Sequence, residues 1–158
     1  MLTVFGALKL LSPDAEYTKG WDFFGGTDDF ENALQLAETS DAAVICLGGS
    51  SARDFSGVYN EKGQAVATKD NFMDCGEGRD VCSLELPGSQ LELLRRLKAI
   101  GKPVISILIQ GRTYLLDEVM QLSDAVIIAW YPGQEGPRAI ADTLFGKLNC
   151  FGRLPVSV

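Results

Sequence analysis

The residues best suited to chemistry are the carboxyl groups of a glycine-rich segment, residues 74–80. Glycines on both sides of Glu77 remove neighbouring side chains and let the backbone present a carboxyl group at a loop tip. Glycoside cleavage uses two carboxyl groups, one of which is kept protonated by burial or by a nearby negative charge. We predict that Glu77 is such a proton donor and that Asp74 and Asp80 raise its pKa. An acidic turn without a catalytic role has the same pattern.

This segment lies in a long interval without clear hydrophobic periodicity, residues 48–87. It spans 40 residues, whereas connections in α/β folds typically run about 2 to 6 residues. It also follows an apolar strand, and α/β sheets bind ligands at the carboxyl ends of their strands. As a group its charged residues predict a ligand site, while a solvated surface position is the alternative for each one alone. They are Arg53, Asp54, Glu61, Asp70, Asp74, Glu77, Arg79 and Asp80.

Composition narrows the class of protein. The chain has 158 residues, 46% of them hydrophobic, which is enough to bury the core of one domain. Its net charge of −7 disfavours nucleic acid, because few cations are present to replace the counterions of a phosphate backbone. No apolar run approaches the roughly 20 residues that cross a bilayer, so we expect no membrane span.

Two absences exclude whole families of chemistry. The chain contains no histidine, which rules out Ser/His/Asp triads, Cys/His dyads and histidine metal ligands. The four cysteines are too scattered for a disulfide scaffold or a metal site.

The turn at residues 48–51 contains two glycines but lacks the lysine of a phosphate-binding loop, and no G-x-G-x-x-G sequence occurs. We therefore predict no metal and no cofactor, and a tight strand-ending turn.

Helical and strand patterns alternate along the chain. Near-continuous apolar runs separated by helices of about ten residues predict a parallel sheet covered on both faces. We expect a doubly wound, flavodoxin-like α/β fold. Helices are predicted at 4–11, from Thr27 or Asp28 through Ala37, at 91–98, 114–122 and 138–145, and strands at 15–18, 42–47, 104–109, 125–130 and 154–158.

The order of these elements is unusual at the N-terminal end of the chain. A sheet of this class normally begins with a strand that lies in its interior, yet this chain opens with a helix. We expect the sheet to lack its first strand, and we interpret the chain as a fragment of a longer protein. Exposed sheet edges recruit other chains, so we also expect self-association into a homo-oligomer.

Several sequence blocks resemble the C-terminal α/β-sandwich domain of glycoside hydrolase family 3, the β-glucosidase and β-xylosidase type. The resemblance extends from about Asp41 to the end of the chain. The blocks are Gly76-Glu77-Gly78-Arg79-Asp80, Leu84-Glu85-Leu86-Pro87-Gly88-Ser89-Gln90, Leu93-Leu94, Gly101-Lys102-Pro103-Val104, Ala129-Trp130-Tyr131-Pro132-Gly133-Gln134-Glu135-Gly136, Ala139-Ile140-Ala141-Asp142, Leu144-Phe145-Gly146 and Gly152-Arg153-Leu154-Pro155.

The resemblance implies a retaining exo-acting glycosidase. In this family an aspartate nucleophile lies on an N-terminal (β/α)8 barrel, and the second domain supplies a glutamate acid/base on a loop over the active site. Glu77 matches that glutamate, and Glu61 is the second candidate because this loop varies within the family. Asp74, Arg79 and Asp80 are then the expected substrate-binding residues. Nothing in residues 1–158 resembles the barrel, so we expect a single truncated domain that lacks the nucleophile.

The chain departs from the family pattern at three places. Asp80-Val81 stands where the family usually has Asp-Arg, Gly136-Pro137 where it has Gly-Gly, and Asn149-Cys150-Phe151-Gly152 where it has Asn-Pro-Ser-Gly. The first departure concerns how the loop that carries the acid/base is anchored.

Two classes of function are compatible with the sequence. The first is a fragment of a β-glycosidase that hydrolyses terminal β-linked glucose or xylose, acts on a β-glycoside or oligosaccharide together with its barrel, and is inert alone. The second is a stand-alone carbohydrate-binding or interaction module without catalysis. A flavodoxin-like redox or phospho-relay protein would need a phosphate loop that the sequence lacks. The sequence assigns neither the particular sugar nor the cellular compartment.

Overall fold

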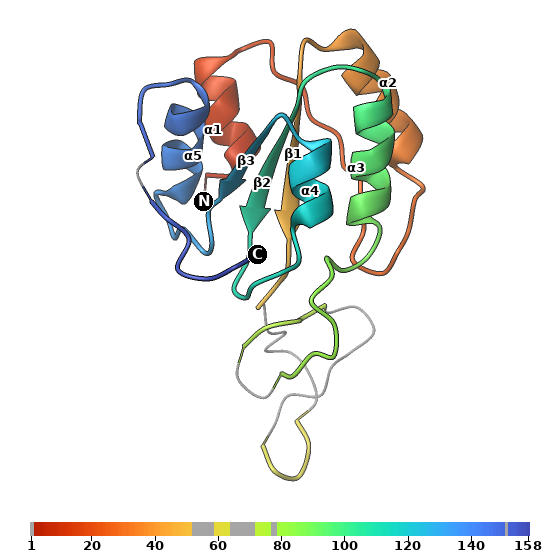
Figure 1. Ribbon diagram of the computed structural model, residues 1–158, viewed down its shortest axis with the longest axis vertical. Helices are drawn as coiled ribbons and strands as arrows, with labels where there is room; N and C mark the ends of the chain where they lie inside the picture. The colour runs from red at the N-terminus through yellow and green to blue at the C-terminus, as the bar shows by residue number, and fades with distance from the viewer. Residues whose placement is uncertain (1, 52–58, 64–71, 77–78, 151) are drawn as a thin grey trace.

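The computed structural model describes residues 2–51, 59–63, 72–76, 79–150 and 152–158. A parallel sheet of three strands lies between two layers of helices (Figure 1). Its strands are β1 (Ala43–Gly48), β2 (Val104–Ile109) and β3 (Ala125–Ile128), in the order β1-β2-β3. The helices α1 (Val4–Leu11) and α5 (Gly136–Leu144) cover one face, and α2 (Phe30–Thr39), α3 (Gln90–Ala99) and α4 (Asp117–Leu122) cover the other. The predicted α/β class is confirmed.

The central strand is the most buried part of the sheet. β2 pairs with β1 from Ala43↔Val104 to Gly48↔Ile109 and with β3 from Ile105↔Ala125 to Leu108↔Ile128. Val104, Ile107 and Leu108 have no exposed surface. Strands buried on both faces read as continuous apolar runs, as this one does, and full burial of each such side chain contributes roughly 1.5–3 kcal/mol.

The main core lies between the sheet and the layer of α2, α3 and α4. Apolar residues at three- and four-residue spacing turn one side of each helix inward. Helix α2 contributes Phe30, Ala33 and Ala37, and α3 contributes three leucines. The buried leucines of α3 are Leu93, Leu94 and Leu97.

Local signals place the helix ends. The side chain of Thr3 accepts a hydrogen bond from the backbone N–H of Gly6 at 3.0 Å, so α1 begins at the predicted residue. Helix α5 begins at Gly136, two residues before the predicted start, because Pro137 fits the first turn, where no N–H partner is needed. Helix α4 begins at Asp117 rather than at Tyr114, whose side chain is engaged elsewhere.

Two predicted strands are wrong. Residues 15–18 and 154–158 are not strands in the structure. A strand needs a neighbour for its backbone hydrogen bonds, and neither segment pairs with β1 or β3, which form the two edges of the described sheet. Pro155 also lacks an N–H group to donate.

The outer edge of β1 is covered only in part. In a parallel strand, every second residue points its backbone N–H and carbonyl groups toward the same neighbouring strand. The backbone groups of Val44, Cys46 and Gly48 point away from β2. The side chain of Gln90 bonds both backbone groups of Gly48, and Trp21 Nε1 donates to the carbonyl of Cys46 at 2.7 Å. Because the three strands pair without interruption, a further strand has room only outside β1 or β3.

Candidate active-site edge

The predicted site lies where the three parallel strands end. In Figure 1 the chain leaves β1 at this edge, the described residues 59–63 lie away from the sheet, and residues 79–89 lead back to α3. We call residues 49–89 the long connection. Its return point is fixed by Ser89, whose N–H donates to the carbonyl of Asp22 at 3.1 Å and whose hydroxyl donates to that of Gly26 at 2.7 Å.

The glycines at the end of β1 are explained by close packing. Gly48 has a φ of 136°, and a Cβ there would collide with the carbonyl of Ile109. A Cβ on Gly49 would collide with the hydroxyl of Tyr114 and the carboxylate of Asp74. This agrees with the interpretation of the sequence as a tight strand-ending turn.

Asp74 lies at the centre of a hydrogen-bonded cluster. One carboxylate oxygen accepts from the N–H of Ser50 at 3.0 Å, and the other accepts from the hydroxyl of Tyr114. The N–H of Asp74 donates to the carbonyl of Ser50, also at 3.0 Å. Asp74 is 9% exposed and Tyr114 is 1% exposed. We call these three residues, Ser50, Asp74 and Tyr114, the clasp.

The hydroxyl of Tyr114 stays protonated at neutral pH. Burial raises the pKa of Tyr114, and its hydrogen bond to the Asp74 carboxylate raises it further. The guanidinium of Arg112, 5.6 Å from the centre of the Tyr114 ring, acts in the opposite direction. Tyr114 is therefore a donor to Asp74.

Cys75, the residue after Asp74, is held from the β3 side of the sheet. The thiol of Cys75 lies 2.9 Å from the hydroxyl of Tyr131, which comes after β3. Burial, followed by the contact with Cys75, raises the pKa of Tyr131. Gly111, which comes after β2, has no room for a Cβ between the Tyr131 ring and the Cys75 sulfur. Asp74 and Cys75 are thus fixed against the ends of all three strands.

An aromatic stack holds the approach to Asp74. The ring of Phe72 stacks on that of Phe23 with centroids 4.4 Å apart, and Trp21 meets Phe23 edge-on at 4.8 Å. The Trp21 side chain thus contacts both Phe23 and the Cys46 carbonyl. Tyr131 is 44% exposed and keeps an accessible ring.

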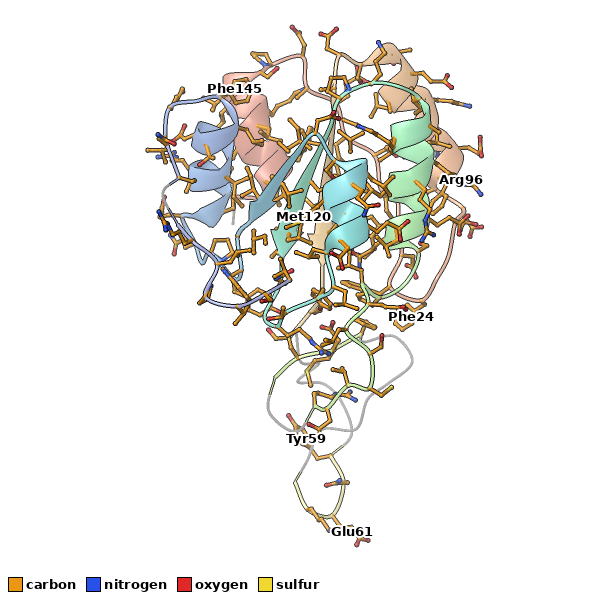
Figure 2. The ribbon with its side chains drawn as sticks, in the orientation of Figure 1. Phe24, Tyr59, Glu61, Arg96, Met120 and Phe145 are labelled. Atoms are coloured by element: carbon orange, nitrogen blue, oxygen red, sulfur yellow. The ribbon has the colours of Figure 1, made fainter. Side chains whose placement is uncertain are left out.

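The predicted site residues are only partly brought together. Arg79 is half-buried and Asp80 is exposed, and the N–H of Arg79 donates to the carbonyl of Gly76 at 3.3 Å. Glu77, the predicted acid/base, lies outside the described residues. Glu61 stands at the far end of the long connection, distant from the sheet (Figure 2). The structure thus separates the second acid/base candidate, Glu61, from the strand ends.

Three buried polar residues at this edge were missed by the sequence analysis. Tyr114 and Gln90 bond across the fold to Asp74 and Gly48, and no local pattern marks such contacts. Gln110 comes directly after β2 and is fully buried, and neither atom of its side-chain amide has a hydrogen-bond partner among the described residues. The sequence does contain a signal for Gln110, because this polar residue directly follows an apolar run that ends at Ile109.

No metal centre or membrane helix is found in the described ranges. Nowhere in them do three or more Cys, Asp or Glu side chains gather as a cation would require. The described helices are also too short or too polar to cross a bilayer.

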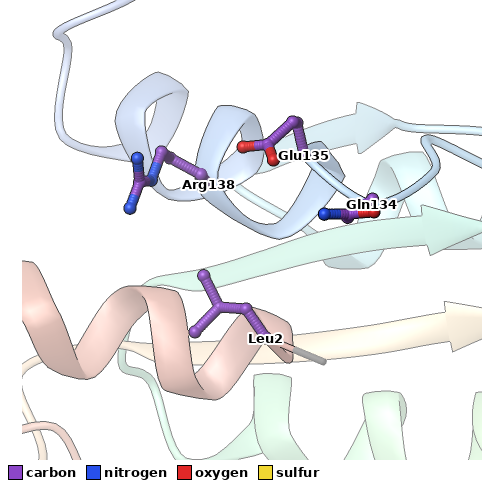
Figure 3. A pocket seen from close by; sticks show the side chains of 4 residues that line it. All are labelled: Leu2, Gln134, Glu135 and Arg138. Carbon is purple, nitrogen blue, oxygen red and sulfur yellow. The ribbon is translucent and has the colours of Figure 1, made fainter.

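A separate cavity of about 460 Å³ lies between the N-terminal ends of α1 and α5 (Figure 3). Leu2, Gln134, Glu135 and Arg138 line it. The described site residues Asp74, Arg79 and Asp80 do not line this cavity, so it is distinct from the clasp.

The sequence pattern of the glycosyl hydrolase family 3 C-terminal domain matches residues 3–158. The chain belongs to this family. Among its relatives, the periplasmic beta-glucosidase of Salmonella typhimurium is 31% identical over 152 residues, which are 96% of this chain and 19% of that protein. The xylan 1,4-beta-xylosidase of Xylanibacter ruminicola is 47% identical over 81 residues, which are 51% of this chain and 9% of that protein.

Solved structures agree on the fold of this family 3 domain. A beta-glucosidase from Erythrobacter marinus superposes with a TM-score of 0.71 at 27% identity, over 92% of this chain and 21% of that one. The beta-glucosidase from Listeria innocua in complex with isofagomine gives a TM-score of 0.73 at 24% identity, over 93% and 18%. The chain therefore spans about a fifth or less of the length of these relatives.

Proposed function

We propose that this domain serves a retaining β-glycosidase that removes terminal glucose or xylose from β-glycosides or oligosaccharides. The observation that carries the proposal is the family match over residues 3–158, together with relatives named as beta-glucosidases and beta-xylosidases. The fixed position of Asp74 and Cys75 at the carboxyl ends of the strands supports it, because this is the edge where α/β folds bind ligands.

The proposal includes a partner domain. The resemblance places the aspartate nucleophile and most sugar contacts on a (β/α)8 barrel, which residues 1–158 do not contain. One acid without its nucleophile cannot complete a double displacement. The isolated chain is then inert toward aryl β-glucosides and β-xylosides, and turnover that copurifies with it would contradict this part of the proposal.

Within the proposal, Glu77 is the acid/base. It protonates the glycosidic oxygen as the nucleophile attacks the anomeric carbon, and the glycosyl-enzyme forms while the leaving alcohol departs. Glu77 then takes a proton from the water that hydrolyses the intermediate. Arg79 and Asp80, two and three residues further on, are the proposed sugar contacts of this segment. Sugar binding by Asp74 stays a prediction, since its carboxylate already has two protein donors.

The test compares Glu77→Gln with Glu61→Gln in the complete enzyme that carries this domain. A leaving group of high pKa needs protonation, whereas nitrophenolate departs without it. Glu77→Gln is expected to lower kcat/KM by about 10²–10⁴-fold for an alkyl or disaccharide substrate and by much less for a nitrophenyl glycoside. Glu61→Gln is expected to change neither. The reverse result would move the acid/base to Glu61.

We also propose that isolated copies associate through the outer edge of β1. Val44 is 40% exposed there, and its backbone groups have no hydrogen-bond partner among the described residues. Strand edges without charge or proline attract a second strand. Light scattering at micromolar concentration should show an oligomer that Val44→Lys dissociates, while Val156→Lys, at a residue 45% exposed outside the sheet, leaves it intact. A monomeric wild type would contradict the proposal.

A further inference from the structure

The long connection leaves the sheet and returns to it at one point. Ser50 and Asp74 are joined by two hydrogen bonds, from the Asp74 N–H to the Ser50 carbonyl and from the Ser50 N–H to the Asp74 carboxylate. These bonds hold together the two ends of the stretch between Ser50 and Asp74, which we call the excursion. The segment after Asp74 therefore starts from a position that is held beside the end of β1.

Tyr114 is the part of the clasp that belongs to the body of the domain. It lies between β2 and α4, and its ring is buried. The N–H of Leu115, the next residue, donates to the carbonyl of Leu84 at 2.8 Å and so ties the same turn to the returning part of the long connection. A buried ring on a tied backbone presents its hydroxyl in one direction, which is toward the Asp74 carboxylate.

We infer that Tyr114 is a positioning residue for the proposed glycosidase, and that it acts through Asp74 to fix the start of the segment that carries the acid/base. This inference rests on the proposed function. It gives Asp74 a role inside the protein instead of the sugar contact that the sequence predicted. The tie between Cys75 and Tyr131 at 2.9 Å holds the same start from the β3 side.

The effect on catalysis comes from geometry. A displacement of about 1 Å of a catalytic group can lower a rate about 10²-fold. The loss falls on the step that needs the acid, because the sugar contacts of the barrel are untouched. Tyr114→Phe is therefore expected to lower kcat about 10- to 100-fold for a substrate with a poor leaving group, with KM nearly unchanged.

The first arm of the test uses this chain alone. Amide hydrogen exchange is measured at Ser50 and Asp74 in the wild type and in Tyr114→Phe. Both amides are expected to exchange at least about tenfold faster in the variant, while amides of β2 keep their protection. Tyr17→Phe is the matched control, since Tyr17 is 66% exposed. Unchanged exchange at Ser50 and Asp74 in Tyr114→Phe would overturn the clasp as the device that fixes the segment.

The second arm uses the complete enzyme and two substrates. Tyr114→Phe should lower kcat/KM more for a poor leaving group than for a nitrophenyl glycoside, since kcat/KM reports the glycosylation step, in which only the poor leaving group needs a well-placed acid. A merely structural role removes active molecules and lowers both rates by the same factor, which would overturn the inference. A raised KM with unchanged kcat would do so too, because it would make Asp74 a sugar ligand.

The two proposals fail in different ways. If Glu77→Gln keeps full activity on poor leaving groups, the assignment of the acid fails, whatever the exchange data show. If Glu77→Gln is impaired as expected and Tyr114→Phe matches the wild type on both substrates, the acid stands and the positioning role of Tyr114 fails.

Discussion

The sheet with its helices and the long connection are held together in different ways. In the body of the domain, β1, β2 and β3 exchange regular backbone hydrogen bonds over fully buried side chains. The described part of the long connection is held by separate contacts, among them the clasp, the stack of Phe72 on Phe23 and the hydrogen bonds of Ser89. Stability is therefore concentrated in one region and the candidate chemistry in the other. Such a division lets a loop vary in length and sequence without loss of the core.

The strongest test of this difference is a substitution that leaves a cavity in the core of the body. Leu108 is fully buried in the central strand, and Leu108→Ala should cost about 2–5 kcal/mol of unfolding free energy. Leu115→Ala, at a leucine that is 52% exposed, is the control and should cost far less. Chemical denaturation measures both. Equal losses would mean that the core is not centred on β2.

Gln90 links the two regions. Its amide bonds the N–H of Gly48 at 2.7 Å and the carbonyls of Gly48 and Pro87 at 2.8 Å. Gln90→Leu leaves these buried groups unpaired and should cost about 2–3 kcal/mol by denaturation. Gln35→Leu, on the exposed side of α2, should change stability by about 0.5 kcal/mol or less. A neutral Gln90→Leu would show that water replaces the amide.

A substitution at Gln110 is expected to raise the stability of the domain instead of lowering it. Its buried amide has no hydrogen-bond partner in the part of the chain that the structure describes, so Gln110→Met removes a desolvated polar group at nearly constant volume. We expect a gain of about 1 kcal/mol in unfolding free energy. Gln121→Met, at an exposed glutamine of α4, should be neutral. Clear destabilisation by Gln110→Met would indicate that a bound water or ligand pairs with the amide.

The smallest effect concerns a surface carboxylate of the body. The backbone N–H of Val104 at 2.9 Å, and then the Lys98 ammonium at 3.0 Å, hold the pKa of Asp124 below its ordinary value of 3.8. A lowered folded-state pKa contributes stability that is complete above the unfolded value and is lost as the pH falls through the folded value. Asp124→Asn should thus melt slightly lower than the wild type at neutral pH.

The difference between Asp124→Asn and the wild type should shrink as the pH falls below about 3.8. Melting curves across this range measure it, with Asp14→Asn, at an exposed residue after α1, as the control. A difference that persists in strong acid would show that the amide substitution, and not the charge, causes the loss.

Local patterns predicted most of the body. The helix 4–11 and the strand 104–109 have the predicted bounds, because a threonine cap and a run of β-branched and leucine residues interrupted by Ser106 act locally. The predicted strands 15–18 and 154–158 failed because pairing depends on a neighbour that no local pattern reveals. The prediction of three parallel strands was also enough to locate the candidate site at their carboxyl ends.

The candidate site was predicted only in outline. The sequence placed acidic residues at the carboxyl edge, and Asp74 does lie there. The partner of Asp74 is Tyr114, 40 residues away, and the helical pattern of residues 114–122 gave that tyrosine a different place. Contacts over such separations depend on the assembled fold. The roles of Glu77, Arg79 and Asp80 stay predictions.

The joined ends of the excursion also suit protein engineering. The turn at residues 60–63, where the Gly63 N–H donates to the Asn60 carbonyl at 2.9 Å, lies at the exposed tip of the long connection (Figure 2). Doubling the length of a flexible loop adds only about 0.6 kcal/mol of closure entropy. A fluorescent reporter with adjacent termini, inserted after Glu61, would therefore extend from the tip while Ser50 and Asp74 keep the domain below it intact.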